Sequence, residues 1–560
     1  MFNVRIVARL RATQRPHAPL FWVKFRAVCG KICNFGVEKG GRGIPSQGYE
    51  KNNTMEHNNI RNWRRAVCAV AIAAVTLSGA MPLSAKNVKA SKKAKTEQTV
   101  NGINTSKSAK SVKPEKKQEL KYIFYFIGDG MGLNPVLAGE AFNRSVLGND
   151  TPLLMLQFPV TSYATSHSAS SDVTDSAAGG TALATGHKTR NGMVGMDADS
   201  VPVQSIASKL FNQGWGVGLV TTGAPDDATP ASFYAHQPNR GMYYEIGAEA
   251  AKSGYQFIAG SNWRGLRDKK GNDTGLARMF AENEVVTVRG LDALRGVDSK
   301  RVVLLNTDSV HSSTIGYTVD SIPGVLTLPG MTEACLRHLQ KVTPDRFFMM
   351  VEEGDIDHSA HSNDGGGVVH EVLTLQNAIR VAYDFYLQHP DETLIVVSAD
   401  HNTGGMALGN MFCSYMANLK TIPYQRISKD RFSDWCRKLL KDKTPVSWDE
   451  MRKELTEKFG YWKAVPLTKE QEEYIRREFD RTFVQGDGST HETMYNSSNN
   501  FVEAVFDTFN DIAGIGFTTE RHTGDFVPVF AIGVDSARFQ GLHDNTDLPK
   551  LIYEISQSDK

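Results

Sequence analysis

The sequence contains little cysteine and no cysteine pattern. Only six of its 560 residues are cysteines, and Cys29, Cys33 and Cys68 lie within the first 85 residues. The other three, Cys335, Cys413 and Cys436, are odd in number and widely spaced. This argues against a disulfide framework and supplies no Cys-x-x-Cys zinc spacing. Any metal bound by this chain must therefore use oxygen and nitrogen ligands.

The chain also lacks net positive charge outside its N-terminal part. Residues 1–119 carry 23 Lys or Arg against six acidic residues, so the rest has a formal charge of −15 although the whole chain is +2. An acidic body lacks the positive field that supplies non-specific affinity for phosphates, so we expect no nucleic-acid binding. If this body handles an anion, bound cations must assist it.

Residues 55–85 have the layout of a secretory signal peptide. A positive region ends in Arg64 and Arg65, an apolar run spans Ala66–Leu77, and small residues follow up to Ala80. The alternative is an uncleaved N-terminal anchor, but the apolar run is short for a membrane span. We expect the signal peptide to be cleaved after Ala80 or Ala85. The mature protein would then be exported, periplasmic or at the cell surface, and would have no transmembrane span.

Two further segments flank this signal. Residues 1–54 form an N-terminal extension without clear periodicity, and the simplest hypothesis is that translation starts at Met55. Residues 86–119 contain ten lysines and no aromatic residue, which is typical of a flexible linker. The linker's charge also allows contact with anionic surfaces.

From about residue 120, short β-branched and aromatic runs alternate with longer helical patterns. This predicts an α/β fold, a three-layer α/β/α sandwich around a large, mostly parallel sheet, over residues 120–560. Residues 406–515 are richer in Trp, Tyr and charge, which favours a helical, cap-like insertion near the active-site face. The predicted strands are Tyr122–Ile127, Val217–Thr222, Val302–Leu305, Phe347–Val351, Thr393–Ser398 and Val527–Ile532.

Acidic and histidine residues follow several of these strands. The C-terminal ends of parallel strands line one crevice, so residues distant in sequence can converge there. Each segment alone also fits an ordinary turn or helix cap, except the dense run 352–361, where Asp357 and His361 share one face of a helical turn. The candidate ligands after strands are Asp129, Asp227, Thr229, Glu352, Asp357, His361, Asp400 and His401, with Arg240 and His522 nearby.

The candidate nucleophile is Ser176, in the segment Val173–Ala182. The small residues after it predict a helix whose first turn carries the serine at the positive end of the dipole. The alternative is an Asp-Ser helix cap. No Gly-x-Ser-x-Gly elbow supports a hydrolase triad, so activation of this hydroxyl must come from metal.

Taken together, these segments resemble the alkaline phosphatase family. GDGMG, VTDSAAGGTA, DDATPA with a downstream Arg, VEEGDIDHSAH, SADHNTGG and RHTG occur in the family's order between Lys121 and Gly533. The resemblance implies two Zn²⁺ and one Mg²⁺. The implied ligands are Asp357, His361 and His522 for the first zinc, Asp129, Asp400 and His401 for the second, and Asp129, Thr229 and Glu352 for magnesium.

The resemblance also implies hydrolysis of small-molecule phosphate monoesters to an alcohol and inorganic phosphate through a phosphoserine on Ser176. Two zinc ions roughly 4 Å apart can hold the attacking and leaving oxygens, and Arg240 can fork onto the phosphate. His358 and Asp227 are implied to bind substrate, Asp227 as an outer-shell carboxylate. Their combination departs from the family's usual pairings and leaves magnesium affinity open.

Three alternatives remain open. A sulfatase would need Cys or Ser followed by x-Pro-x-Arg, and a phosphodiesterase of the same superfamily usually has a Thr nucleophile and lacks the third-metal Thr and Glu. A non-catalytic exported phosphate-binding protein is the third. The chain is compatible with a homodimer, whereas its sequence determines neither oligomeric state nor physiological substrate.

Overall fold

The structure is a computed structural model that describes residues 119–307, 313–413 and 415–558. The predicted N-terminal extension (1–54), the signal peptide (55–85) and all but the last residue of the linker (86–119) lie outside these ranges. Within the described ranges, no helix combines the length and the hydrophobicity that a bilayer crossing requires.

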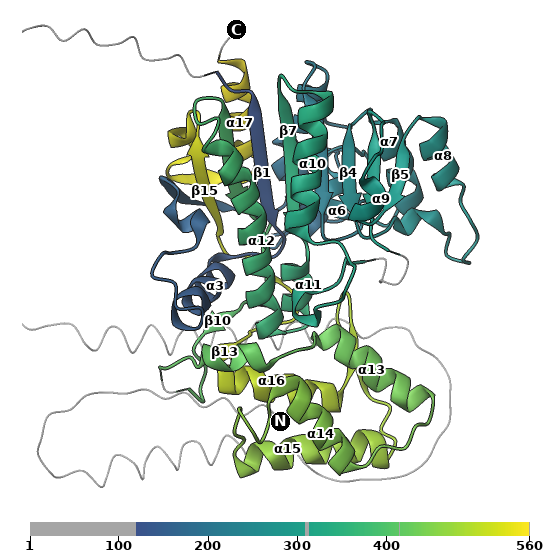
Figure 1. Ribbon diagram of the computed structural model, residues 1–560, viewed down its shortest axis with the longest axis vertical. Coiled ribbons are helices and arrows are strands. Elements are labelled where there is room, and N and C mark those ends of the chain that lie inside the picture. The colour runs from purple at the N-terminus through teal and green to yellow at the C-terminus, as the bar shows by residue number, and fades with distance from the viewer. Residues whose placement is uncertain (1–118, 308–312, 414, 559–560) are drawn as a thin grey trace, which may run out of the picture. The chain divides into compact units, whose positions relative to one another are not determined.

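A ten-stranded sheet forms the centre of the described chain (Figure 1). Within this sheet, as far as the structure describes it, only β15 runs antiparallel to the other strands, so the predicted mostly parallel sheet is confirmed. All six predicted strands are present, with bounds that differ by at most two residues. In spatial order the strands are β16 (Leu542–Asp544), β2 (Val160–Thr165), β15 (Val527–Gly533), β8 (Thr393–Ser398), β1 (Tyr122–Gly128), β7 (Phe347–Glu353), β3 (Gly216–Thr221), β4 (Phe257–Gly260), β6 (Val302–Leu305) and β5 (Val286–Arg289).

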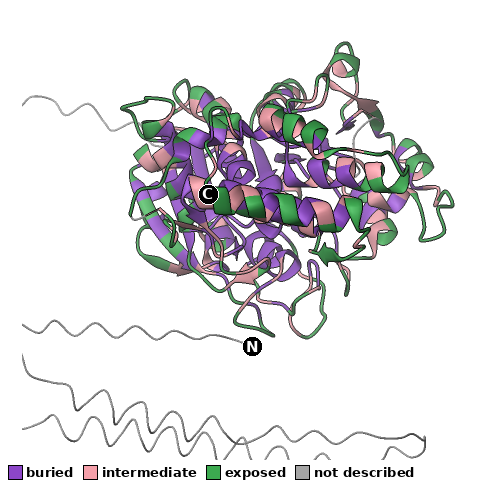
Figure 2. Cartoon of the chain, turned by 90° about the horizontal axis from the view of Figure 1, so that it is seen from below, coloured by how far each residue is buried: buried purple, intermediate pink, exposed green. Residues whose placement is uncertain are grey.

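Helices cover both faces of this sheet, which confirms the three-layer α/β/α class. Successive residues of β7 show the two faces, because Phe347 packs on Phe385 of α12 whereas Phe348 packs on Phe233, which follows α6. The central strands are therefore apolar on both sides, and Figure 2 shows buried residues running along them. One face carries α10 (Leu328–Val342) and α12 (Gly365–Tyr386); the other carries α4 (Ser176–Thr185), α5 (Ile206–Phe211), α6 (Ala228–Ala231) and α17 (Asp547–Gln557).

Shorter elements connect these layers. The helices are α3 (Leu133–Ser145), α7 (Tyr243–Lys252), α8 (Leu276–Glu282), α9 (Leu291–Leu294), α11 (Asp355–His361) and the 3₁₀ turns η1 (Leu154–Gln157), η2 (Arg264–Leu266), η3 (Thr318–Asp320) and η6 (Ser536–Phe539). A two-stranded pair joins β9 (Asn402–Thr403) to β14 (His522–Thr523) in antiparallel register.

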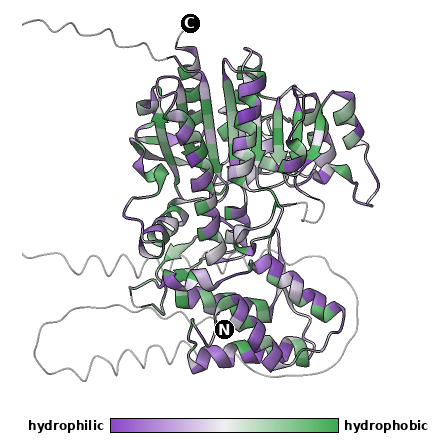
Figure 3. Cartoon of the chain, viewed as in Figure 1, coloured by the Kyte–Doolittle hydropathy of each residue, from purple (hydrophilic) through white to green (hydrophobic). Residues whose placement is uncertain are grey.

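Residues 406–515 contain a second apolar cluster of their own. Its members include Phe432, Phe459, Phe501 and the fully buried Tyr461, so this tyrosine packs in a core, as expected. In Figure 3 its helices alternate hydrophobic and hydrophilic residues. The elements are β10 (Ala407–Leu408), η4 (Leu419–Tyr424), α13 (Lys429–Lys441), α14 (Trp448–Phe459), α15 (Lys469–Phe479), the π-helical η5 (Asp480–Val484), β11 (Thr490–Glu492), β12 (Ser497–Asn499) and α16 (Asn500–Ala513), followed by β13 (Ile515–Gly516).

Buried polar contacts tie this segment to the residues around α11. Asp364, the N-cap of α12, accepts hydrogen bonds from Gln425 Nε2 at 2.7 Å and from the backbone N of Lys429 at 2.9 Å. Asp430 of α13 accepts one from Ser362 Oγ at 3.0 Å. The start of α13 is thereby held against the end of α11.

Candidate active site

Four neighbouring strands, β8, β1, β7 and β3, deliver most of the predicted site residues to one edge of the sheet. The register aligns Ile127 of β1 with Ser398 of β8 and with Glu352 of β7, so their next residues lie side by side. Glu352 itself lies within β7, which extends two residues further than predicted. Buried carboxylates therefore accumulate where the strands end.

Asp129, Asp400 and His401 come together at this edge. Their ligand atoms lie within 4.8 Å of one another, with His401 Nε2 3.1 Å from Asp400 Oδ2 and 3.4 Å from Asp129 Oδ1. Both carboxylate oxygens are buried and accept no hydrogen bond of standard geometry. Burial and the carboxylates of Asp400 and Asp357 raise the pKa of Asp129. Such a group of buried lone pairs fits a cation.

Gly130 allows a second group to lie directly beside the first. It has a φ of +69°, and a Cβ there would stand 2.9 Å from the Cα of Asp357. Only glycine meets both demands without strain. The GDG turn therefore allows Asp357 to approach Asp129.

Asp357, His361 and His522 form this second group. His361 Nδ1 donates to the carbonyl of Glu520 at 2.6 Å, and His522 Nδ1 donates to that of Thr174 at 2.9 Å. In a neutral ring this donation leaves Nε2 as the lone pair, and the two Nε2 atoms lie 3.0 Å apart.

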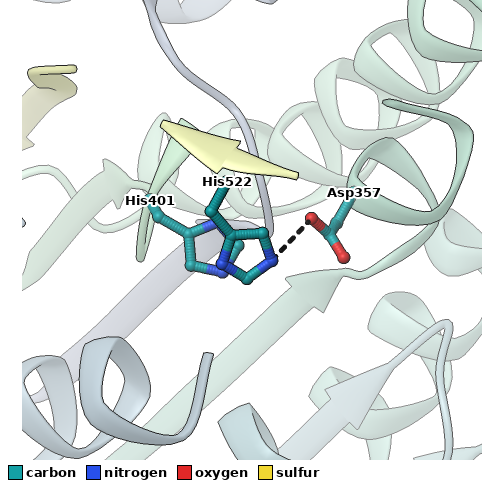
Figure 4. Close-up of side chains that lie close together, drawn as sticks. All are labelled: Asp357, His401 and His522. Atoms are coloured by element: carbon teal, nitrogen blue, oxygen red, sulfur yellow. Dashed lines mark ion pairs between the residues drawn. The ribbon is translucent and has the colours of Figure 1, made fainter. Parts of the chain in front are cut away.

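The Asp357 carboxylate faces the same two nitrogens. His361 Nε2 lies 3.4 Å from Asp357 Oδ2, and His522 Nε2 lies 3.7 Å from Asp357 Oδ1 (Figure 4). Burial and the ring of His401 lower the pKa of His522 to about 4, which keeps that ring neutral. Lone pairs that face each other repel unless a cation lies between them.

His522 reaches this position through the pairing of β14 with β9. That pair sets His522 opposite Thr403, and its ring stacks on His401 with centroids 3.6 Å apart. Figure 4 shows His401, His522 and Asp357 from three segments converging, and their ligand atoms lie within 4.8 Å. The two predicted zinc groups therefore adjoin.

The predicted magnesium residues lie on the other side of Asp129. Glu352 and Thr229 are buried, and Thr221 Oγ1 donates to Glu352 Oε2. Burial, together with the charges of Asp227 and Asp400, raises the pKa of Glu352 to about 8. Thr229 Oγ1 has no hydrogen bond of standard geometry. Carboxylate and hydroxyl oxygens are the ligands that Mg²⁺ prefers.

Ser176 is the first residue of α4, as predicted. Asp175 is the N-cap, and its Oδ1 accepts from the backbone N of Ala178 at 3.0 Å. Ser176 is 1% exposed, and its Oγ lies 3.2 Å from His401 Nε2. The segment is thus a helix cap, and its serine also faces a candidate ligand.

Arginine and histidine side chains complete the site. Asp227 caps α6 and pairs with Arg240 Nη2 at 3.0 Å, and Arg240 Nη1 lies 3.5 Å from Asp175. Although burial opposes it, Arg264 and Arg240 hold the pKa of Asp227 below its usual range. His358 Nδ1 lies 3.1 Å from Asp355 Oδ1. One small cavity is lined by Asp129, Ser176, Gly223, Asp227, Thr229, Arg240, Glu352, Gly354 and His358.

Two residues of this site escaped the sequence analysis. Arg264 Nη2 lies 3.2 Å from Asp227 Oδ2 and follows β4, whose four residues were not recognised as a strand. Applying the strand-end rule to β4 would have found it. Tyr495, between β11 and β12, places its ring 3.9 Å from that of His358. Only the packing of the distant hairpin brings it here.

The family model for alkaline phosphatase matches residues 120–265 and 310–558. This chain belongs to the alkaline phosphatase family. The second matched range contains 406–515, which the motifs had left unsupported, and the match is interrupted only over residues 266–309.

Individual alkaline phosphatases agree with this family assignment. Alkaline phosphatase 4 of Bacillus subtilis (strain 168) is 28% identical over 453 residues, 79% of this chain and 90% of that protein. The cold-active alkaline phosphatase of Shewanella sp. has a TM-score of 0.65 at 25% identity over 78% of this chain and 100% of that chain. A TAB5 alkaline phosphatase mutant, with Mg bound in its M3 site, has a TM-score of 0.54 at 21% identity over 79% and 99%.

Membership gives this chain its enzyme class, phosphoric monoester hydrolase. The family is metal-dependent, and two overlapping sets of residues have the spacing of metal ligands: Asp357, His401 and His522, and Asp129, Asp400 and His401. The buried, unpaired oxygens and facing imidazoles described above fit such cations.

Proposed function

We propose that this alkaline phosphatase hydrolyses phosphate monoesters through a phosphoserine on Ser176, with two Zn²⁺ and one Mg²⁺ bound beside it. The first zinc would be held by Asp357, His361 and His522. The second would be held by Asp129, Asp400 and His401, and magnesium by Asp129, Thr229 and Glu352.

The observation that carries this proposal is the pair of facing imidazoles. Both Nδ1 atoms donate to backbone carbonyls, so the Nε2 lone pairs of His361 and His522 point at each other across 3.0 Å beside Asp357. A backbone-fixed tautomer of this kind is the usual support of a metal-ligating histidine.

The bound cations would supply Lewis-acid stabilisation of charge on the serine, the leaving oxygen and the phosphoryl group. The chain's own residues position the reactants. Asp175 holds Ser176 at the N-terminus of α4, where backbone N–H groups and the dipole favour the anionic ester. Arg240 offers its fork to two phosphoryl oxygens and is itself oriented by Asp227 and Asp175.

The bonds change in two displacements. Ser176 Oγ, having lost its proton to solvent, forms a bond to phosphorus, and the bond from phosphorus to the alcohol oxygen breaks, so the alcohol leaves with a solvent proton. Water then attacks the phosphoserine, the bond to Ser176 Oγ breaks, and inorganic phosphate leaves. The small residues of α4 support this placement, because a Cβ at Gly179 would stand 3.0 Å from the carbonyl oxygen of Asp400.

We propose export as well, since residues 55–85 have the pattern of a signal peptide and the match to the family model begins after them, at residue 120. In that case the domain begins near residue 120, and 406–515 caps the site face. The N-terminal sequence of secreted protein tests the cleavage site.

The experiment compares wild type with Ser176→Ala on a phosphate monoester, a diester and a sulfate ester. We expect wild type to prefer the monoester and to yield, after acid quench, a peptide containing Ser176 with one added phosphoryl group. Ser176→Ala should lose both the hydrolysis of the monoester and the phosphorylated peptide. Preference for the diester would favour the phosphodiesterase alternative, and binding of phosphate without turnover would favour the non-catalytic one.

A further inference from the structure

A second, larger cavity lies beside the site. Its volume is about 610 Å³, and it is lined by residues of the loop 313–322, of α13 and of the β11–β12 hairpin. The cavity is much larger than a phosphoryl group needs, and none of the residues assigned above to a metal or to the nucleophile lines it.

Two contacts connect this cavity to the small one around Ser176. Tyr495 lines the large cavity, and its ring packs against His358, which lines the small one. Thr314 also lines the large cavity and forms a β-bridge with Gly223 of the small one. Tyr495 and Thr314 therefore form a shared wall.

The same wall is held in place by hydrogen bonds. Thr314 Oγ1 donates to Asp355 Oδ2 at 2.5 Å, and Asp355 Oδ1 lies 3.1 Å from His358 Nδ1. Phosphate at Arg240 and a group in the large cavity would therefore lie in adjacent spaces, with Tyr495 and His358 between them.

We propose that the large cavity binds the alcohol part of the phosphate ester, which rests on the proposed function. The geometry is suited to this because Tyr495, which lines the cavity, packs against both His358 and His361, so the cavity begins beside the proposed first-zinc ligands, where the leaving oxygen would lie. The segment 406–515 then acts in substrate choice, since α13 and the hairpin form most of the cavity wall.

The lining selects a chemical class of alcohol. It carries four carboxyl groups, on Asp320, Asp430, Asp434 and Glu492, against two guanidinium groups, on Arg431 and Arg437. Hydroxyl and amide groups supply most of the rest, with Ile322 and Met494 as apolar members. An alcohol that bears hydroxyl or ammonium groups fits this surface, whereas one with a second phosphate meets like charge.

Charge reversal at the rim tests the class. Glu492 is exposed and belongs to β11. For Glu492→Lys we expect kcat/KM to fall for O-phosphoethanolamine and to rise for fructose 1,6-bisphosphate, each by about two- to fivefold. The matched control is Glu457→Lys, an exposed position of α14 outside the cavity lining, which should change neither value.

Filling the cavity tests its size. Ile322→Trp should lower kcat/KM for glucose 6-phosphate by about tenfold relative to methyl phosphate, whose alcohol part does not reach the cavity. Inhibition by inorganic phosphate, which has no alcohol part, checks that the anion site is intact. If this inhibition is unchanged and neither variant alters the substrate ratios, the proposal is overturned. Wild type without any phosphatase activity would instead overturn the proposed function, and this proposal with it.

Discussion

Replacing Glu352 by glutamine is expected to stabilise the metal-free protein and to remove its further stabilisation by Mg²⁺. In the metal-free state Glu352 is a buried carboxyl group beside other carboxylates, and its pKa rises from 4.5 to about 8. Between these values the folded state binds more protons than the unfolded state, so stability falls as pH rises through this window. Glutamine cannot ionise and removes that loss.

The size of the effect follows from the shift. At pH 7, which lies about 2.5 units above the pKa of Glu352 in the unfolded state, the ionisation of Glu352 lowers the free energy of unfolding by about 3 kcal/mol. For a domain of about 440 residues the unfolding entropy is near 0.9 kcal/mol per kelvin, so Glu352→Gln should raise the Tm of metal-free protein by about 3 °C. In wild type, Mg²⁺ at 100 times its Kd should add about 2.7 kcal/mol, again about 3 °C. Glu352→Gln should lose this second gain, because a neutral amide is a weaker ligand.

The assay is thermal unfolding of chelator-treated protein at pH 7, with and without added Mg²⁺. Glu371→Gln is the matched control, because burial and the charge of Asp355 also raise the pKa of Glu371 to about 8 and it lies outside the predicted metal groups. This control should gain stability without metal and keep the response to Mg²⁺. The reasoning is refuted if Glu352→Gln lowers the metal-free Tm or keeps the full Mg²⁺ response.

Two further changes test other parts of the site, and a third tests a buried histidine of α12. Gly130→Ala places a methyl group 2.9 Å from the Cα of Asp357 at a φ of +69°, so kcat/KM should fall by about tenfold. Bound zinc is measured in parallel, and a variant with full zinc content and full activity would contradict this expectation. Arg264→Met removes the partner of Asp227 Oδ2 and should raise the inhibition constant for inorganic phosphate about tenfold. An unchanged inhibition constant would show that Arg240 alone orients Asp227. Burial lowers the pKa of His370 from 6.5 to about 4. Below pH 6.5 the folded state therefore binds fewer protons than the unfolded state, and at pH 5 this lowers the free energy of unfolding by about 2 kcal/mol. His370→Gln should reduce the drop in Tm between pH 7 and pH 5, and equal drops in the variant and in wild type would refute this expectation.

The sequence alone determined the elements and the chemistry of the strand ends. Continuous, β-branched and aromatic apolar runs such as Tyr122–Ile127 are typical of strands buried on both faces, and acidic residues that follow parallel strands meet at one edge of the sheet. The spacing of Asp357 and His361 placed both on one helical turn, and the structure has that turn in α11. These inferences succeed because each depends on a few neighbouring residues.

Contacts between distant segments were decided only by the tertiary structure. His522 is an isolated histidine in the sequence, and the pairing of β14 with β9 stacks it on His401. Arg264 follows a strand of four residues, and Tyr495 lies about 140 residues from the histidine that it packs against. No local sequence pattern predicts these contacts, because they depend on the order of the strands in the sheet and on how the 406–515 segment packs on α11. The candidate ligand types were thus readable from the chain, whereas the cavity that we propose for the alcohol arises from packing alone.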